Sequence, residues 1–168
     1  TINGIAVKRV PIYVPKHPSG TKRLLHHASF AMTSAPALIR AAPAWRPQVV
    51  FSVAPSLMSS ALAARAARWS GAASWLHVQD FEVDAAFELG ILTNARLRKT
   101  MFAVERKIMQ SFDRVSTISP QMVRGLERKG VAEDRIRELR NWIDTSQIAP
   151  GGRMTAIRTD LGYAASGE

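Results

Sequence analysis

Apolar and polar positions along this chain follow two different periods. Short apolar runs bounded by proline, glycine or polar residues predict buried strands at 49–53, 74–78, 114–118 and 136–139. Between these runs, apolar residues recur every three or four positions, which predicts helices at 21–42, 55–69, 94–112 and 119–130. Strands that alternate with helices indicate an α/β fold. We therefore predict a Rossmann-like parallel sheet with helices on both faces.

Turn and capping residues refine these bounds. Asn94 can cap its helix, and Ser119 followed by proline is typical of a helix start. Pro36 falls inside the helix 21–42, where we expect it to kink or split the helix because it lacks an N–H. The β-branched stretch 5–14 predicts one more strand, with a proline that places it at an edge. We expect the run 49–53 to be buried on both faces, and we expect the helix 94–112 to bury Leu97, Met101, Val104, Ile108 and Phe112.

Ligands of open parallel sheets bind at the carboxyl ends of the strands. That rule indicates three places: residues 77–84, Ser119 and residues 141–144. A histidine at position 77 can hydrogen-bond a sugar hydroxyl or, when protonated, hold a phosphate. It can equally be a histidine satisfied by backbone at the top of the sheet. Asp80 can supply a carboxylate for acid–base chemistry, although clusters of acids at a helix start are more often solvated charges that suit the helix dipole.

Charge is distributed unevenly along the 168 residues, which carry a net charge of +10. Residues 1–79 contain nine Lys or Arg side chains and no Asp or Glu. Such a field attracts anions, so nucleic acid, acidic lipid head groups and a lipid-diphosphate acceptor are all possible partners, as is a charge that serves solubility alone.

The start of the helix 21–42 combines cations with leucines. Lys22 and Arg23 precede two leucines and two histidines, and Lys16 lies in the preceding loop. A basic, apolar helix can lie on an anionic membrane surface, and we expect Lys16, Lys22 and Arg23 to contact membrane or anion there. An ordinary amphipathic helix with its basic face in water is the other interpretation.

Several classes of function lack their sequence signals. The chain has no cysteine, so disulfides and thiolate chemistry are excluded. It contains no G-x-S-x-G elbow, no phosphate-binding loop, no G-x-G-x-x-G and no metal-ligand spacing, so we expect no metal site. No recognised nucleic-acid-binding signature accompanies the basic residues, so no nucleic-acid partner is expected.

Three segments together resemble the N-terminal domain of glycosyltransferase family 4, in its exopolysaccharide and colanic-acid biosynthesis branch. They are VPIYVPKHPSGTKRLLHHASF, PQVVFSVAPSLMSSALAARAARWSGAASWLHVQDFEVDAAFELG and FDRVSTISPQMVRGLERKGVAEDRIRELRNWID. The resemblance implies a GT-B fold with residues 1–150 as the acceptor-binding domain and 151–168 as the linker and start of a nucleotide-sugar-binding domain. It also implies that the family's first strand and glycine-rich loop would precede Thr1.

What the resemblance implies about activity follows from the family. It implies a retaining transfer from a nucleotide-sugar to a lipid-linked polysaccharide precursor, with neither a metal nor another cofactor. The expected place is the cytoplasm, at the inner face of the cytoplasmic membrane, with the acidic membrane surface and the lipid-linked acceptor as partners. The donor would bind through the second domain, so we expect residues 1–168 alone to be inactive.

The family's functional positions map onto four residues. His77 matches the cleft-facing histidine and Asp80 the polar position just beyond it, and these two are the expected catalytic residues. Ser119 matches the serine that opens the next helix and Asn141 the asparagine at the interdomain turn, and both are expected to bind substrate. Trp142 departs from the family's usual glycine. The alternative is a non-catalytic basic module that binds acidic membrane or nucleic acid.

Overall fold

The computed structural model describes residues 1–17, 20–54, 57–88, 90 and 94–146. The predicted domain division near residue 150 lies outside these ranges. Ten elements follow one another: α1 (Gly20–Trp45), β1 (Val49–Ala54), α2 (Leu57–Ser70), β2 (Ala73–Val78), α3 (Glu82–Glu88), α4 (Ala95–Gln110), β3 (Arg114–Thr117), α5 (Pro120–Arg128), the 3₁₀-helix η1 (Glu133–Arg135) and β4 (Ile136–Glu138). The four strands predicted from 49 onward are all present, each within a residue or two of the expected bounds.

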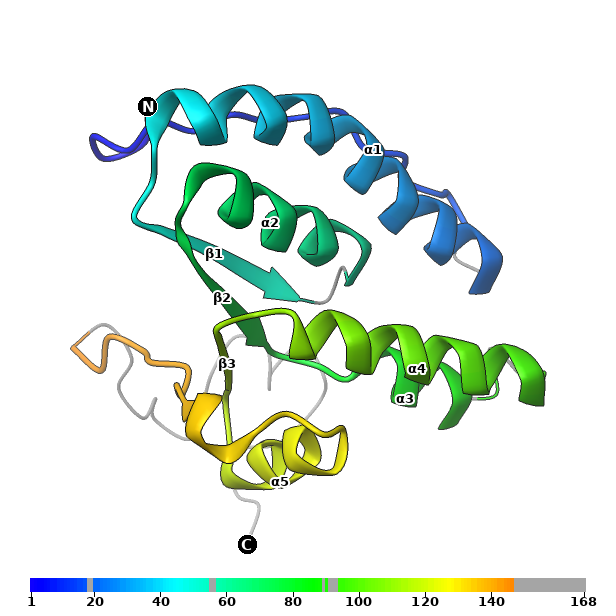
Figure 1. Ribbon diagram of the computed structural model, residues 1–168. Helices are drawn as coiled ribbons and strands as arrows, with labels where there is room; N and C mark the ends of the chain where they lie inside the picture. The colour runs from blue at the N-terminus through cyan, green and yellow to red at the C-terminus, as the bar shows by residue number, and fades with distance from the viewer. Residues whose placement is uncertain (18–19, 55–56, 89, 91–93, 147–168) are drawn as a thin grey trace, which may run out of the picture.

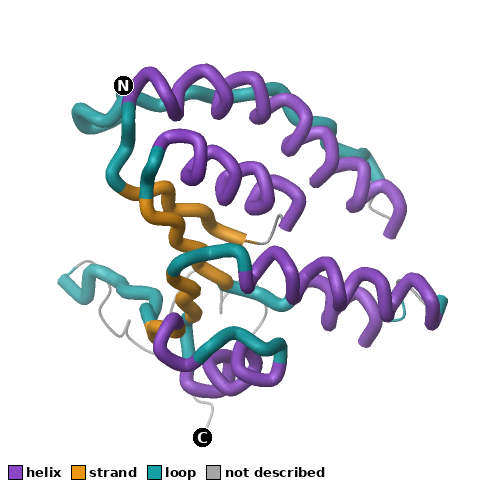
Figure 2. The backbone as a smooth tube through the Cα atoms, in the orientation of Figure 1, coloured by secondary structure: helices purple, strands orange, loops and turns teal. Residues whose placement is uncertain are grey.

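The four strands form one parallel sheet in the order β1-β2-β3-β4. This confirms the predicted α/β, Rossmann-like class. Figure 2 shows the strands in the middle of the molecule, with α1 and α2 on one side of the view and α5 on the other. Strands that are added in one direction through right-handed crossovers place their crossover helices on the same face of the sheet.

The hydrophobic core lies on that one face. Leu76 and Val115 point into it from the sheet, and they meet Ala64 of α2, Phe112 after α4 and Leu126 of α5. Helical cover is thus confirmed for this face. The part of the chain that the structure describes shows no helix packed against the other face.

The uncovered face corrects the expectation for β1. Val49, Phe51 and Val53 alternate along the strand on the side away from the core, and all three are exposed. β1 is the edge strand of the described sheet, and only its other side chains face α2. The prediction that this strand is buried on both faces is therefore wrong, because an apolar run does not say which elements cover it.

The N-terminal segment is not the strand predicted at 5–14. Ile2 and Ile5 form an isolated bridge around a tight turn, and the following residues run along α1 (Figure 1). The backbone there bonds to helix side chains: the Tyr13 amide donates to Ser29 Oγ at 3.0 Å, and the Thr33 hydroxyl donates to the Pro11 carbonyl at 2.7 Å. Polar side chains of α1 thereby replace the neighbouring strand that this segment would need.

Pro36 does not split α1, which runs without interruption past it. Proline at this position removes the intrahelical bond to the Met32 carbonyl. Both Pro36 and Met32 are exposed, so water can bond that carbonyl and the helix only curves (Figure 1).

Capping and turn predictions are confirmed where they depend on local chemistry. The Asn94 side chain accepts hydrogen bonds from the backbone of Arg96 and Leu97, both at 3.0 Å. Gly71 and Gly130 have φ of 70° and 79°, a conformation that favours glycine.

The buried face of the predicted helix 94–112 matches the prediction only in part: Phe112 is buried and Ile108 packs against the core. Leu97 and Val104 are exposed, whereas the carboxylate residue Glu105 is buried. The helix therefore presents a face rotated from the expected one, and a charge occupies its centre.

Candidate functional site

The predicted site residues follow strands whose ends are aligned. Val78 pairs with Thr117, and Thr117 pairs with Glu138. Asp80 and Ser119 each come two residues after these paired positions, and Asn141 comes three residues after its own. The parallel register therefore brings the three loops to the same edge of the sheet.

His77 lies one residue before the end of β2, on the face away from the core. Its side chain is buried, with a relative exposure of 6%. Nδ1 lies 2.9 Å from Ser116 Oγ on the neighbouring strand, and the ring stacks on Phe51 with a centroid distance of 5.9 Å. Trp75 Nε1 donates to the same Ser116 hydroxyl at 2.8 Å. Two strands and two aromatic rings therefore hold the imidazole in one orientation.

This arrangement favours neutral His77. Burial lowers the pKa of His77. Ser116 Oγ accepts from Trp75, so its own proton can be donated to Nδ1 of the imidazole. In that arrangement Nε2 carries the ring proton and can donate to a ligand oxygen. The geometry suits a hydrogen bond to a sugar hydroxyl better than charge pairing with a phosphate.

The loop after β2 meets the start of α1. His27 Nε2 lies 3.0 Å from Glu82 Oε1, although the two residues come from distant parts of the chain. Burial raises the pKa of Glu82 to about 7; Arg23 opposes this shift, and Asp80 adds to it. Burial, together with His26 and Arg23, lowers the pKa of His27. Glu82 thus lies close to exposed Asp80, and Arg23 is near both Glu82 and His27 rather than directed only to the surface.

Ser119 and Asn141 have different surroundings. Ser119 Oγ accepts from the Met122 amide at 3.3 Å as the N-cap of α5, so part of its role is structural. Asn141 lies in an exposed loop after β4, next to Trp142, which is 85% exposed. Both residues thus lie at the carboxyl edge, and in the described part of the chain neither forms a hydrogen bond with His77.

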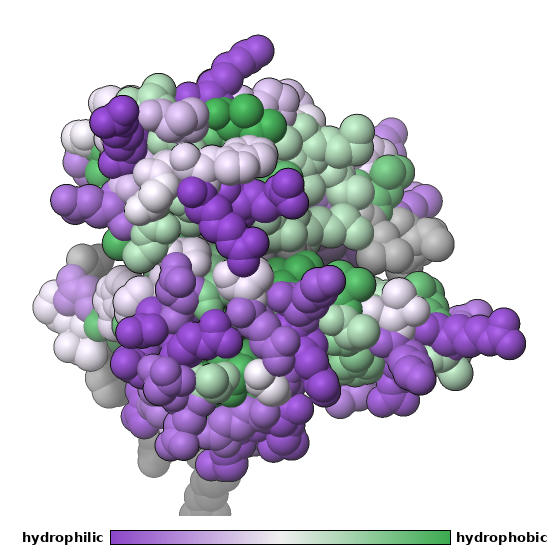
Figure 3. Space-filling model, viewed as in Figure 1, coloured by the Kyte–Doolittle hydropathy of each residue, from purple (hydrophilic) through white to green (hydrophobic). Residues whose placement is uncertain are grey.

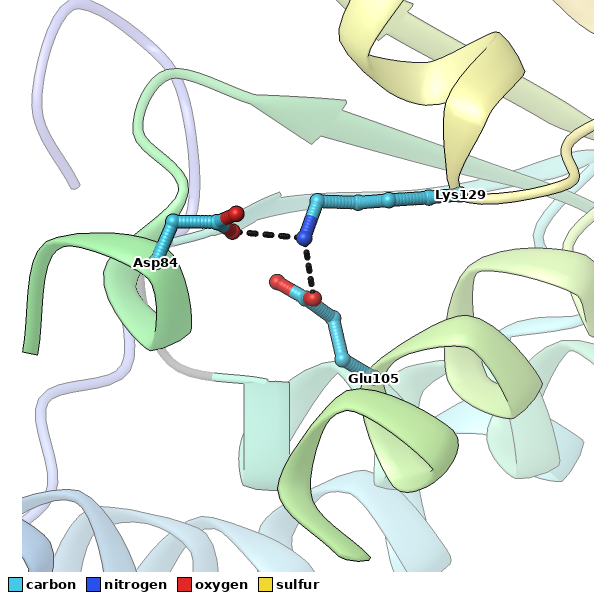
Figure 4. Close-up of polar contacts among 3 residues, drawn as sticks. All are labelled: Asp84, Glu105 and Lys129. Carbon is cyan, nitrogen blue, oxygen red and sulfur yellow. Dashed lines mark hydrogen bonds and ion pairs between the residues drawn. The ribbon is translucent and has the colours of Figure 1, made fainter. Parts of the chain in front are cut away.

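An ion-pair cluster fixes the elements behind this edge. Lys129 Nζ lies 2.5 Å from both Asp84 Oδ2 of α3 and Glu105 Oε2 of α4 (Figure 4). The ammonium group also lies over the rings of Phe81 and Phe102. Because α3 directly follows the Asp80 loop, this cluster positions that loop against α4 and the end of α5.

Sequence reasoning missed Ser116, Phe51 and the Lys129 cluster. Ser116 and Phe51 carry no motif, although strand alternation places both on the side of His77 once the register is known. Glu105 carried a signal, because it is spaced four residues from Met101 and Met109 and so falls within the apolar face of its helix.

Among the described residues, no group of three or more His, Asp or Glu side chains could hold a metal ion. No helix in the described ranges is long and apolar enough to cross a membrane.

Comparison with known proteins places the chain in a family. The family model of the glycosyl transferase 4-like domain matches residues 1–142. WcaI of Escherichia coli (strain K12), described as a colanic acid biosynthesis glycosyl transferase, is 38% identical over 160 residues. The alignment covers 92% of this chain and 39% of WcaI, so the chain spans well under half the length of this relative. The match over nearly all of the described sheet and its helices shows that the chain belongs to the glycosyl transferase 4-like domain family.

Proposed function

We propose that this chain is the acceptor-side part of a retaining glycosyltransferase that transfers a sugar from a nucleotide-sugar to a lipid-linked polysaccharide precursor. The observation that carries the proposal is the family match over residues 1–142, together with the identity to a transferase described for colanic acid biosynthesis. The donor would bind mainly through a second domain, with neither a metal nor another cofactor. The reaction would take place on the cytoplasmic side of the membrane.

The geometry at the end of β2 supports a role for His77. Its Nδ1 is held by Ser116, and its lowered pKa keeps the ring neutral near pH 7. A neutral imidazole with a fixed orientation can donate from Nε2 to a hydroxyl of the sugar being transferred or of the acceptor. Binding energy of this kind raises the rate when the hydrogen bond strengthens in the transition state.

Asp80, two residues after the end of β2, can add a carboxylate to the proposed site. It is exposed at the carboxyl edge and lies close enough to Glu82 to raise the pKa of that carboxyl group. An exposed carboxylate can accept a hydrogen bond from an acceptor hydroxyl. Ser119 and Asn141, which follow the next two strands, complete the proposed substrate-binding edge.

The test uses the full-length protein that contains this chain. Sugar transfer is measured with a panel of nucleotide-sugars and a polyprenyl-diphosphate-linked sugar as the acceptor. His77→Ala is expected to lower kcat by about 100-fold or more, the usual range for a positioned catalytic group. Lys107→Ala, which changes an exposed side chain in the last turn of α4 just before the start of β3, at the opposite edge of the sheet, is the control and is expected to leave kcat unchanged.

Three further measurements separate the parts of the proposal. The anomeric configuration of the product, read by NMR, tests retention. An acceptor without its lipid tests the lipid-linked class, and residues 1–168 alone are expected to transfer nothing. The proposal would be overturned if the wild-type protein transferred no sugar from any nucleotide-sugar in the panel. It would also be overturned if folded His77→Ala and His77→Asn both kept full activity.

A further inference from the structure

Asp80 lies in a short loop that connects β2 to α3. The loop consists of residues 79–81, because β2 ends at Val78 and α3 begins at Glu82. Three extended residues span at most about 10 Å, so the position of the loop depends on how its two ends are held. The Asp80 side chain is exposed, so the loop backbone decides where its carboxylate lies.

Contacts with β3 and α5 hold the loop at both of its ends. The Thr117 hydroxyl of β3 donates to the Val78 carbonyl at 2.8 Å, which fixes the end of the strand. The Phe81 ring packs against Gly125 of α5, and the Lys129 ammonium group lies 4.9 Å from the centroid of that ring. One further contact joins the loop to a different element, α1.

This contact is a pair of side chains between α1 and the start of α3. His27 Nε2 lies 3.0 Å from Glu82 Oε1, and the two side chains are only 19% and 22% exposed. α1 packs mainly against α2, and Figure 1 shows these two helices on the other side of the view from α5. Because partial burial shields the contact from water and salt, it is stronger than the same contact at the surface.

The pair can form in either charge state of Glu82. Burial raises the pKa of Glu82 to about 7, so both forms are populated near neutral pH. An ionised Glu82 accepts the Nε2 proton of His27, and a protonated Glu82 donates to the same nitrogen when the ring proton is on Nδ1. The geometry therefore supports a lasting hydrogen bond rather than a switch that opens with pH.

We propose that His27 and Glu82 are positioning residues, which hold the loop 79–81 so that Asp80 meets the acceptor hydroxyl. The inference rests on the proposed function, in which Asp80 accepts a hydrogen bond from the acceptor. A loop without this contact must be ordered when the acceptor binds, and that ordering lowers the affinity for the acceptor. Both residues act through Asp80 and not by contact with the substrate.

Steady-state kinetics of the full-length protein test the proposal, with the nucleotide-sugar and the acceptor varied separately. His27→Leu and Glu82→Leu are each expected to raise KM for the acceptor about tenfold and to leave KM for the donor unchanged. A variant that merely unfolds in part would lower the amount of active protein, and hence the apparent kcat, without changing either KM. The double variant is expected to equal the single ones, because each substitution removes the same contact.

Three variants separate this contact from other effects. Glu82→Gln is expected to keep the wild-type KM for the acceptor, because an amide can still bond to His27. His26→Leu makes the same change one position earlier on α1, where Nδ1 of the ring lies 2.6 Å from the Tyr13 carbonyl oxygen. Glu127→Leu repeats the other change at an exposed position of α5, over which the surface is largely hydrophilic (Figure 3). The last two variants are expected to keep the wild-type KM for both substrates.

Hydrogen–deuterium exchange measures the loop directly and needs no sugar transfer. In His27→Leu and Glu82→Leu, the amides of residues 79–82 are expected to exchange about tenfold faster than in the wild type. In Glu82→Gln and Glu127→Leu, the same amides are expected to exchange at the wild-type rate.

Three results would overturn the proposal: unchanged acceptor KM and loop exchange in both leucine variants, an equal rise of KM for donor and acceptor, or a Glu82→Gln variant that behaves like Glu82→Leu. Transfer that His77→Ala lowers and His27→Leu leaves unchanged would keep the proposed function and reject the positioning role. Absence of transfer in the wild type counts against the proposed function, and the exchange rates then decide whether the pair holds the loop.

Discussion

Removing the ammonium group of Lys129 should destabilise the fold, because it leaves the buried Glu105 carboxylate without its cation. Glu105 is 1% exposed, and its Oε1 has no hydrogen-bond partner, so Lys129 is the main group that compensates its charge. Burial raises the pKa of Glu105, and Lys129 opposes this shift. Breaking a buried ion pair by removing one partner costs about 3–5 kcal/mol. We expect Lys129→Met to lower the free energy of unfolding by about 3 kcal/mol at pH 8. The value lies at the low end of this range because Asp84, the other carboxylate bound by Lys129, is partly solvated and loses less stabilisation.

The cost should depend on pH in a defined direction. Without Lys129, the folded-state pKa of Glu105 rises further above its unfolded value. A raised pKa means that stability is fully present below the unfolded pKa and is lost as pH rises through the folded one. Lys129→Met should therefore be better tolerated at pH 5, where Glu105 can be neutral, than at pH 8.

Hydrogen–deuterium exchange of peptides from α4 and α5 in the full-length protein measures this effect locally. A loss of 3 kcal/mol corresponds to about 100-fold faster exchange or more. The double variant Lys129→Met with Glu105→Leu should recover most of the protection, because both buried charges are gone. The reasoning fails if the single variant exchanges like the wild type at pH 8, or if the double variant is no better than the single one.

Three other predictions follow from single contacts. Burial raises the pKa of Glu82 to about 7, so the stability that its neutral form contributes is lost as pH rises from about 4.5 through 7. The free energy of unfolding of Glu82→Gln should therefore rise by up to about 3 kcal/mol relative to that of the wild type between pH 5 and pH 8. Hydrogen-exchange profiles of variant and wild type that change in parallel between the two pH values would contradict this. A Cβ added at Gly125 would lie 2.6 Å from Phe81 Cε2, so Gly125→Ala should lower the melting temperature through a cost of about 1–3 kcal/mol, and an unchanged melting temperature would show that the ring moves freely. Asn94→Ala removes two capping bonds and should cost about 1 kcal/mol, measured as faster exchange confined to the first turn of α4; uniform change along the helix would argue against a local cap.

Local signals in the sequence predicted the local features of the fold. The order of strands and helices from residue 49 onward, the Asn94 and Ser119 caps and the helix-ending glycines all depend on neighbouring residues. Period and capping chemistry are properties of a few consecutive positions, and they were confirmed. The same reasoning brought His77, Asp80, Ser119 and Asn141 to one edge, because a parallel sheet aligns the ends of its strands.

Features that depend on distant partners could not be predicted in this way. The segment 5–14 has the composition of a strand, but α1 side chains supply its hydrogen bonds, so it joins no sheet. The sequence of β1 indicates burial on both faces, but the side of the strand that carries Phe51 points away from the core and is exposed. The pairing of His27 with Glu82, and of Lys129 with Glu105, joins residues that are 55 and 24 positions apart.

The sequence by itself determined the fold class, the strand order along the chain, the single sign of charge in the first 79 residues and the strand ends where a site can form. Those features follow from periodicity and composition, which need no partner. Only the tertiary structure decided which ring nitrogen of His77 is held, where Lys129 places its charge and which side of α1 remains exposed. Each of these depends on the register and packing of elements that are far apart in the chain, and burial then sets the pKa values and the surface that chemistry can use.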